Sequence, residues 1–339
     1  MSDYTPLNRP NVSVVIAVFN VENYIAQCCH SLFSQTLDNI EYIFVNDCSP
    51  DKSIEVVKSV LEEYPHRKRQ VKILEHTVNL GVSRTREDGI KAATGDFIIH
   101  CDPDDWVESD MYKSMYEKAI ENNADMVICD VYFHYPSSSK TYYAKETRDT
   151  SSSREILANC LHAQTPILHC YLWNKLIRAP YYKTVTWHSG ISLYEDVITC
   201  SQIMQTQLKV SCIGQAFYYY RQREESLLHR RFTQKNIEND YKVVSILHHY
   251  LCESGDPELI YYWQAFVPWL MAFSIHSTDP IYTNKEYLER YRKYRSCILK
   301  DRGLSKSARY YLYSTTFNYI IPFTLLQWYR RIGRLLKNK

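Results

Sequence analysis

Residues 95–106 have the sequence GDFIIHCDPDDW, and this stretch decides the fold. Its apolar part, 96–101, has the length and composition of a buried β-strand. Three carboxylates follow within four positions, at Asp102, Asp104 and Asp105. Several negative charges at a strand end are costly unless a cation compensates them. The stretch therefore predicts a strand that ends at a cation site, although a solvated acidic turn gives the same pattern.

The flanking sequence repeats this strand signature at regular intervals. Short apolar runs predict further strands over 12–18, 41–46, 71–75 and 126–131. Between them, helical spacing of apolar residues predicts helices over 21–36, 51–63, 82–93 and 109–122. Such alternation is typical of an α/β fold with a mostly parallel central sheet covered by helices on both faces.

Polar residues follow three of the predicted strands at their carboxyl ends. Phe19 and Asn20 follow the first strand, Asp47 the second, and the three carboxylates the fourth. Ligands of open parallel sheets bind beyond these ends, so we expect one site there. Mg²⁺ or Mn²⁺ is commonly held by one or two protein carboxylates, while phosphate oxygens and waters complete the shell. The pattern thus favours a divalent cation bound together with a diphosphate.

Composition excludes several classes of protein. The 339 residues carry 40 basic and 38 acidic side chains, for a net charge of +2, which indicates no nucleic-acid partner. No G-x-x-x-x-G-K-[ST] or G-x-G-x-x-G motif is present, which excludes ordinary kinases and dinucleotide enzymes. The eleven cysteines contain no C-x-x-C pair and are expected to be reduced, buried thiols. The first residues lack a signal-peptide pattern, so a cytoplasmic location is expected.

Four motifs in order resemble those of the family 2 glycosyltransferases, which have the GT-A fold. They are VVIAVFN, VNDCSPD, NLGVSRTREDG and GDFIIHCDPDD, at 14–20, 45–51, 79–89 and 95–105. The resemblance covers about 12–230. It implies that Phe19 and Asn20 begin a nucleotide pocket, that Asp47 accepts a hydrogen bond from a uracil-like base, and that Arg86 lies near the base and phosphates.

The same resemblance implies that Asp102 contacts the ribose or the metal and that Asp104 ligates the metal directly. The sequence departs from the family at Ala17, Asn46 and Glu87, where other residues are usual. These departures leave the identity of the base open. Asp47 as a turn residue and Asn20 as a helix cap stay alternatives, because both residue types favour such positions.

Residues 192–197, SLYEDV, resemble the family's E-D motif at the start of a helix. The resemblance implies that Asp196 is the general base and that Glu195 is a supporting or acceptor-binding carboxylate. The alternative is that both acids only complement a helix N-terminus. The segments WNKL and YRQREESL resemble family segments that bracket this motif, and they place three basic residues on the substrate side: Lys175, Arg221 and Arg223. Surface ion pairs are the alternative for the two arginines.

The last residues, 310–339, combine an uncharged aromatic stretch with a basic end. The segment 310–329 contains Pro322 and several polar residues, which make it a poor membrane span. Aromatic and basic residues favour a position in the interface of an anionic membrane. The alternative is a helix that packs back on the catalytic domain or on a second subunit of a homo-oligomer.

Together these features predict a protein of two parts. Residues 1–231 form a GT-A-like domain, with a donor half at about 12–131 and an acceptor half at about 154–231, and 232–339 form a helical, aromatic-rich region. The Ser- and Tyr-rich stretch 136–153 between the halves is expected to be an exposed excursion. We expect an inverting, metal-dependent transfer from a nucleoside diphosphate sugar, UDP-linked by resemblance, to a saccharide or lipid-linked saccharide of a surface polysaccharide. A metal-dependent nucleotidyltransferase and a non-catalytic saccharide-binding or membrane scaffold protein stay as alternatives.

Overall fold

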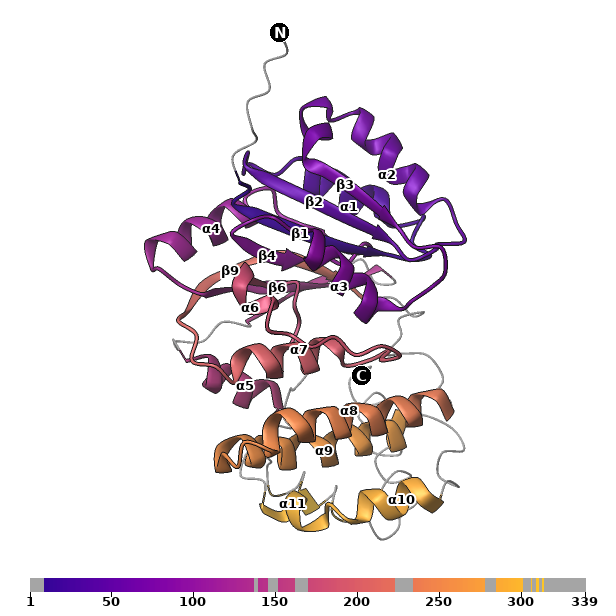
Figure 1. The fold of residues 1–339 in the computed structure, drawn as a ribbon, viewed down its shortest axis with the longest axis vertical. Coiled ribbons are helices and arrows are strands. Elements are labelled where there is room, and N and C mark those ends of the chain that lie inside the picture. Colours follow the sequence, from indigo (N-terminus) through magenta and orange to yellow (C-terminus); the bar gives the residue numbers. More distant parts are fainter. Residues whose placement is uncertain are drawn as a thin grey trace, which may run out of the picture. The chain divides into compact units, whose positions relative to one another are not determined.

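The chain divides into two compact units (Figure 1). The first consists of Met1–Leu157 and Leu168–Glu224, and the second of Ala158–Ile167 and Glu225–Lys339. The computed structural model describes residues 9–136, 140–145, 152–161, 170–222, 234–277, 285–300, 306, 309, 310 and 313.

Four parallel strands at the start of the chain form the predicted sheet. They are β1 (Val12–Val18), β2 (Ile40–Asn46), β3 (Val71–Glu75) and β4 (Phe97–His100), in the order β3-β2-β1-β4. Val12 pairs with Ile40 on one side and with Phe97 on the other. Every residue of β1 except Ala17 is buried, which explains why all of its residues but Ser13 are apolar.

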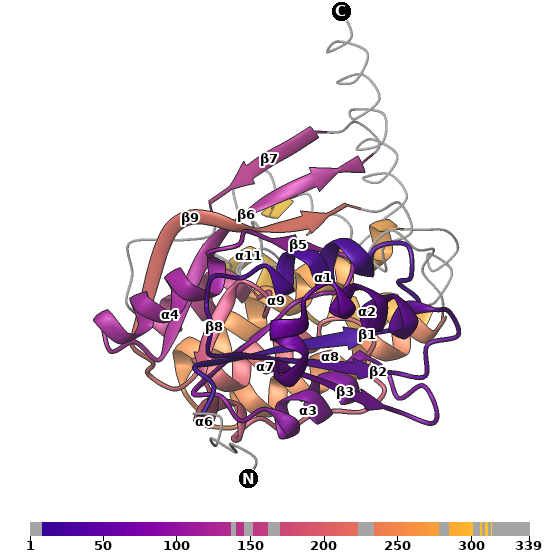
Figure 2. The same cartoon turned by 90° about the horizontal axis from the view of Figure 1, so that it is seen from above.

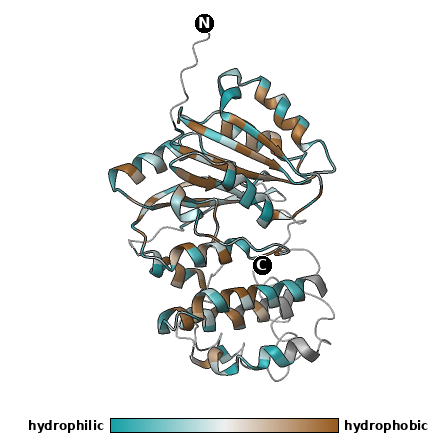
Figure 3. Ribbon diagram, viewed as in Figure 1, coloured by the Kyte–Doolittle hydropathy of each residue, from teal (hydrophilic) through white to brown (hydrophobic). Residues whose placement is uncertain are grey.

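The helices that connect these strands also match the predicted pattern. They are α1 (Ile25–Phe33), α2 (Ser53–Glu62), α3 (Val82–Ala92) and, after β4, α4 (Met111–Glu121). The helices α1 and α2 lie on one face of the four strands and α3 lies on the other (Figure 2). Crossover connections between parallel strands are right-handed. The connections through α1 and α2 run in one direction along the sheet, and the connection through α3 runs back to β4 on the far side of β1, so α3 must cover the opposite face. The strands are mostly hydrophobic and the outer helix turns mostly hydrophilic (Figure 3).

The rest of the sheet is mixed. It is built from β8 (Lys175–Arg178), β6 (Met126–Tyr135), β9 (Val210–Arg221) and β5 (Trp106–Val107), in this order after β4, with β7 (Lys140–Ala144) paired to β6. The strand β8 is antiparallel to both β4 and β6, whereas β6 and β9 are parallel. Within 136–153, where an exposed excursion is expected, the described residues include the largely exposed strand β7, which pairs with β6 and has no predicted counterpart. Short helices complete this unit: η1 (Pro65–Gln70), α6 (Ala179–Tyr182) and α7 (Glu195–Met204), and α5 (Ser153–Leu161) begins in it.

Helices alone make up the described part of the chain after 231, as predicted. They are α8 (Gln234–Cys252), α9 (Pro257–Ser277), α10 (Lys285–Arg292) and α11 (Arg295–Lys300), and the other three all contact α9. A small core joins them, made of Ile237, Val267, Met271, Tyr291 and Ile298. No described helix combines the length and the apolar character that a bilayer crossing needs. Apart from residues 310 and 313, the segment 310–339 expected at a membrane lies outside the described residues.

Candidate active site

The carboxyl ends of β1, β2 and β4 bring the predicted donor-side residues to one edge of the sheet. The strand order reverses between β1 and β4, and ligands bind at such a point in open sheets. The amide of Cys101 donates to Val15 O at 3.0 Å, so the loop 101–105, here called the carboxylate loop, begins directly beside β1. The predicted site residues Phe19, Asp47 and Asp102 therefore leave the sheet at the same edge.

Phe19 and Asn20 form the exit from β1. The side chain of Phe19 is 46% exposed, unlike those of the strand before it. Asn20 has a φ of 55°, in the left-handed region that Asn tolerates, and its amide donates to Ser49 Oγ at 2.8 Å. The alternative that Asn20 caps α1 is wrong, because Tyr24 is the residue that precedes this helix. The turn instead ties the loops after β1 and β2 together and presents the Phe19 ring at the edge.

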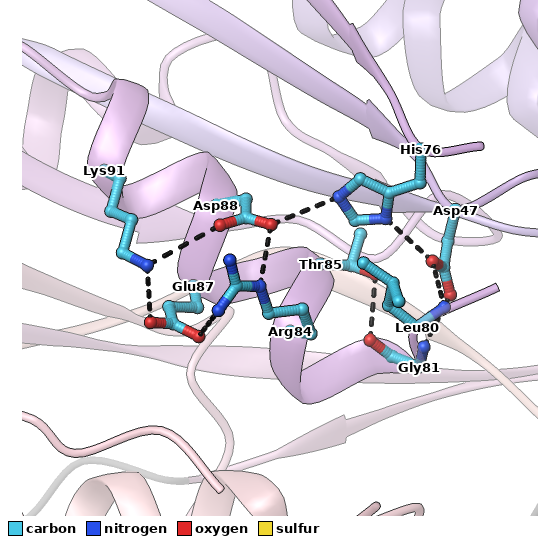
Figure 4. Close-up of polar contacts among 9 residues, drawn as sticks. All are labelled: Asp47, His76, Leu80, Gly81, Arg84, Thr85, Glu87, Asp88 and Lys91. Atoms are coloured by element: carbon cyan, nitrogen blue, oxygen red, sulfur yellow. Dashed lines mark hydrogen bonds and ion pairs between the residues drawn. The ribbon is translucent and has the colours of Figure 1, made fainter. Parts of the chain in front are cut away.

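Asp47 leaves the end of β2 and is buried (Figure 4). Its two oxygens accept hydrogen bonds from the amides of Leu80 and Gly81, at 2.7 and 2.8 Å. His76 Nδ1 donates to the same carboxylate at 2.8 Å. The described contacts of Asp47 thus hold the loop between β3 and α3. A nucleobase that donates to the Asp47 carboxylate would have to compete with these hydrogen bonds.

Asp105 anchors the loop that follows β4. It is fully buried, and it accepts hydrogen bonds from the Tyr218 hydroxyl and the Arg221 amide, both at 2.8 Å. The Tyr218 hydroxyl also accepts one from the Asp102 amide at 3.1 Å. Burial, followed by the negative charges of Asp104 and Asp102, raises the pKa of Asp105 well above its usual range. Asp105 therefore shapes the loop from inside, which leaves Asp102 and Asp104 as its partly buried carboxylates.

Arg86 connects this loop to the predicted acceptor side. It extends from α3, and its side chain is only 7% exposed. One nitrogen lies 3.0 Å from Asp102 Oδ1 and another lies 2.7 Å from Glu195 Oε1. Burial lowers the pKa of Arg86, but the charges of Asp102 and Glu195 outweigh it and raise the pKa above the ordinary value. The guanidinium therefore remains charged between two carboxylates.

Glu195 and Asp196 begin α7. Tyr194, just before them, has a φ of 70°, an unfavourable backbone conformation for a bulky side chain. Burial and the adjacent charge of Glu195 raise the pKa of Asp196 to about 7, against the opposing charge of Arg86. A pKa near neutrality suits a general base. A carboxyl group that only complements a helix N-terminus is stabilised in its ionised form, which corresponds to a lowered pKa.

The three predicted basic residues are placed differently. Lys175 is buried, and its ammonium donates to Tyr171 O at 2.7 Å and to Asn174 Oδ1 at 2.8 Å, so the chain's own acceptors enclose it. Arg221 donates from Nε to Asp104 O at 2.7 Å, and its guanidinium lies 4.6 Å from the centre of the Trp106 ring. Arg221 is therefore part of the carboxylate loop's support. Arg223 lies outside the described residues.

The carboxylate loop fits a cation that arrives with its own oxygen ligands. Within the described residues, no group of three His, Cys, Asp or Glu side chains is arranged to hold a metal ion. Asp102 and Asp104 supply two carboxylates, which is the protein share typical of Mg²⁺ and Mn²⁺ when phosphates complete the shell. The donor set thus suits a cation carried on a diphosphate better than one held by the protein alone.

Two residues of this region escaped the sequence analysis. Tyr218 lies under the carboxylate loop, in a run of three consecutive buried residues of β9, 216–218, and no alternating pattern in the sequence indicates its inward direction. His76 is the first residue after β3, and its position beside Asp47 gives it the same strand-end setting as the predicted residues.

Comparisons with known proteins agree with this geometry. The model of the family "Glycosyl transferase family 2" matches residues 13–185. The uncharacterized glycosyltransferase EpsJ of Bacillus subtilis is 32% identical over 64% of this chain, and the minor teichoic acid biosynthesis protein GgaB of the same organism is 30% identical over 63%. The matched part spans 63% of EpsJ and 23% of GgaB, so it is less than two thirds of either protein.

A solved structure shows the same fold over nearly the whole chain. Residues 1–349 of S. aureus TarS, in complex with UDP-GlcNAc, match with a TM-score of 0.69 at 16% identity, covering 95% of this chain and 92% of that one. At this identity the likeness concerns the fold alone. Since the family model covers about half of the chain and its matched segment includes β1–β4 and the carboxylate loop, the chain belongs to the family 2 glycosyltransferases.

Proposed function

We propose that this protein is an inverting glycosyltransferase. It takes a sugar from a nucleoside diphosphate sugar, with uridine the expected base, and transfers it to a saccharide or lipid-linked saccharide during the synthesis of a surface polysaccharide. The teichoic acid role in the name of GgaB and the UDP-GlcNAc bound to TarS support this choice of acceptor class and donor.

One observation carries the proposal. Arg86 holds Asp102 of the carboxylate loop and Glu195 beside Asp196 at the same time. A transferase needs its donor diphosphate and its general base on opposite sides of one reacting carbon. Contact of one arginine with both Asp102 and Glu195 supports a shared centre for the donor side and the base side of the site.

In the proposed reaction, Asp196 accepts the proton of the acceptor hydroxyl as that oxygen attacks the anomeric carbon. The bond from this carbon to the diphosphate breaks, and the configuration inverts. Asp104 and Asp102 would hold the Mn²⁺ or Mg²⁺, which stabilises negative charge on the departing diphosphate. Arg86 keeps Asp102 and Glu195 in place, and Glu195 raises the basicity of Asp196.

The remaining features extend the proposal. The catalytic domain is proposed to span 1–231 and an appended helical region 232–339, whereas the first compact unit ends at Glu224 and leaves out 158–167. The segment 310–339 holds the enzyme at the inner face of the plasma membrane, near a lipid-linked acceptor. A chain cut after Arg309 should then no longer sediment with anionic liposomes, and unchanged sedimentation would exclude this role of the segment.

A panel of nucleoside diphosphate sugars tests the reaction directly. The full-length protein, Mn²⁺ and each donor should be incubated with membrane extract as the source of acceptor. Release of a nucleoside diphosphate supports transfer of the sugar. Release of pyrophosphate in a parallel incubation with nucleoside triphosphates and sugar 1-phosphates would instead indicate a nucleotidyltransferase. Binding of saccharide without release of either product would indicate a non-catalytic protein.

A further inference from the structure

The ring of His76 lies between two carboxylates from different elements (Figure 4). Nδ1 is 2.8 Å from Asp47 Oδ1, after β2, and Nε2 is 3.3 Å from Asp88 Oδ2, on α3. The His76 side chain is only 10% exposed. Carboxylates accept hydrogen bonds and do not donate them, so Nδ1 is the donor in the contact with Asp47. The Nε2 contact is a close approach to Asp88 that is not aligned as a hydrogen bond.

Asp88 also belongs to a surface network. Arg84 Nε lies 3.0 Å from it and Lys91 Nζ lies 3.7 Å from it. Both basic side chains are about half exposed, at 44% and 57%, so water weakens their attraction to Asp88. Of the basic side chains that the structure shows around Asp88, His76 is the least exposed, and it alone also contacts Asp47.

The contacts of Asp47 fix the loop that leads into α3. Its carboxylate binds the amides of Leu80 and Gly81, and Gly81 directly precedes the helix with a φ of 86°. Thr85 Oγ1 then donates to Gly81 O within the first turn. Asp47 therefore holds the start of α3, and His76 joins that point to Asp88 further along the same helix.

The loop held in this way exposes apolar side chains at the ligand edge of the sheet. Val78 is 57% exposed and Leu80 is 42% exposed, and both lie between the end of β3 and the start of α3. Phe19, 46% exposed, leaves β1 at the same edge. Exposed apolar side chains at a binding edge favour a ligand with a flat apolar face, such as a nucleobase.

We propose that His76 is a positioning residue for the nucleotide. Its ring lies between Asp47 and Asp88 and so holds residues 77–81 in the shape that receives the base. The inference rests on the proposed function, because it takes the ligand of this edge to be a nucleoside diphosphate.

Three variants separate the two contacts of the ring. His76→Leu removes both. His76→Asn keeps an amide near the position of Nδ1, which still reaches Asp47, but loses Asp88. Asp88→Asn removes the far partner, and His66→Asn, at an exposed histidine of η1, is the control for the same chemical change.

The readouts are the Kd of UDP with Mn²⁺, from calorimetry, and the KM and kcat of the full-length enzyme. His76→Leu should raise Kd and donor KM on the order of tenfold, with kcat changed much less, because a charge-assisted contact is lost from the binding edge and not from the reacting atoms. His76→Asn should recover part of the affinity. The double variant His76→Leu with Asp88→Asn should lose little more than His76→Leu, since both changes break one connection.

Two results would overturn the inference. If His76→Leu and His76→Asn bind UDP and use the donor as the wild type does, His76 positions nothing that the nucleotide touches. If they lower kcat with Kd and KM unchanged, the residue acts on another step. A wild-type protein that binds no nucleoside diphosphate contradicts the proposed function itself, and this inference with it.

Discussion

Arg86 Nη1 lies 2.7 Å from Glu195 Oε1, although the two residues are 109 positions apart in the chain. The same guanidinium binds Asp102 at 3.0 Å. A planar, permanently charged group with five donors can serve two carboxylates in fixed directions, which a single ammonium cannot do. Through Arg86, the position of Glu195, and with it that of the neighbouring predicted general base Asp196, depends on the carboxylate loop that is predicted to hold the donor.

Arg86→Lys should therefore disable the site although it keeps the charge. The shorter reach of one ammonium leaves Asp102 or Glu195 without its partner, and transfer should fall at least about 100-fold. Leaving a largely buried carboxylate unpaired should also lower the free energy of unfolding by about 3 kcal/mol. Initial rates and urea denaturation measure both effects.

Arg84→Lys is the matched control for that change. Arg84 lies on the same helix and also contacts two carboxylates, Glu87 and Asp88, but at the surface. Its replacement should change rate and stability little. Equal losses in the two variants would contradict the bridging role of Arg86.

Asp104→Ala and Asp196→Asn should separate donor binding from proton transfer. Both should abolish transfer, but only Asp104→Ala should abolish the Mn²⁺-dependent part of UDP binding, because Asp196 is assigned to the acceptor. Calorimetry with and without Mn²⁺ gives the distinction. Asp96→Asn, at the opposite end of β4 in an exposed pair with Arg9, should leave rate and binding unchanged. Metal-dependent binding that survives in Asp104→Ala would remove this residue from the predicted metal site.

The sequence predicted those parts of the fold that depend on local pattern. The strand β1 and the start of α3 fall at the predicted residues because the apolar run and the helical spacing are visible in the chain itself. The short strand β8, by contrast, has too few residues for a period, and its antiparallel place between β4 and β6 is set by its neighbours.

The site shows the same division. The residue types at strand ends predicted where Asp47 and Asp102 would lie, but they carried no information about their partners. Asp47 is engaged by the backbone amides of Leu80 and Gly81, and backbone groups have no sequence signature. The burial of Lys175 likewise depends on acceptors that only the folded chain brings around it.

The pH dependence of transfer should report the environment of Asp196. A general base acts when ionised, so kcat/KM should rise with pH up to the pKa of Asp196, at about 7, and then level off. Glu195→Gln removes a negative charge that raises this pKa, while Arg86, which lowers it, remains. The acidic limb of the profile should therefore move to lower pH in Glu195→Gln. A limb that stays in place, or moves to higher pH, would argue against Asp196 as the titrating base.

Tyr218→Phe should weaken the carboxylate loop by removing a single oxygen. The buried Tyr218 hydroxyl donates to Asp105 and accepts from the Asp102 amide, so its loss leaves two polar groups without this partner. A cost of about 2 kcal/mol in the free energy of unfolding is expected, together with weaker Mn²⁺-dependent UDP binding, since the loop carries the predicted metal ligands.

Tyr182→Phe is the matched control, because the Tyr182 hydroxyl is also buried but has no hydrogen-bond partner among the described residues. Removing an unsatisfied buried hydroxyl should leave stability unchanged or slightly raise it. Equal effects of the two substitutions would mean that the Tyr218 hydroxyl does not hold the loop.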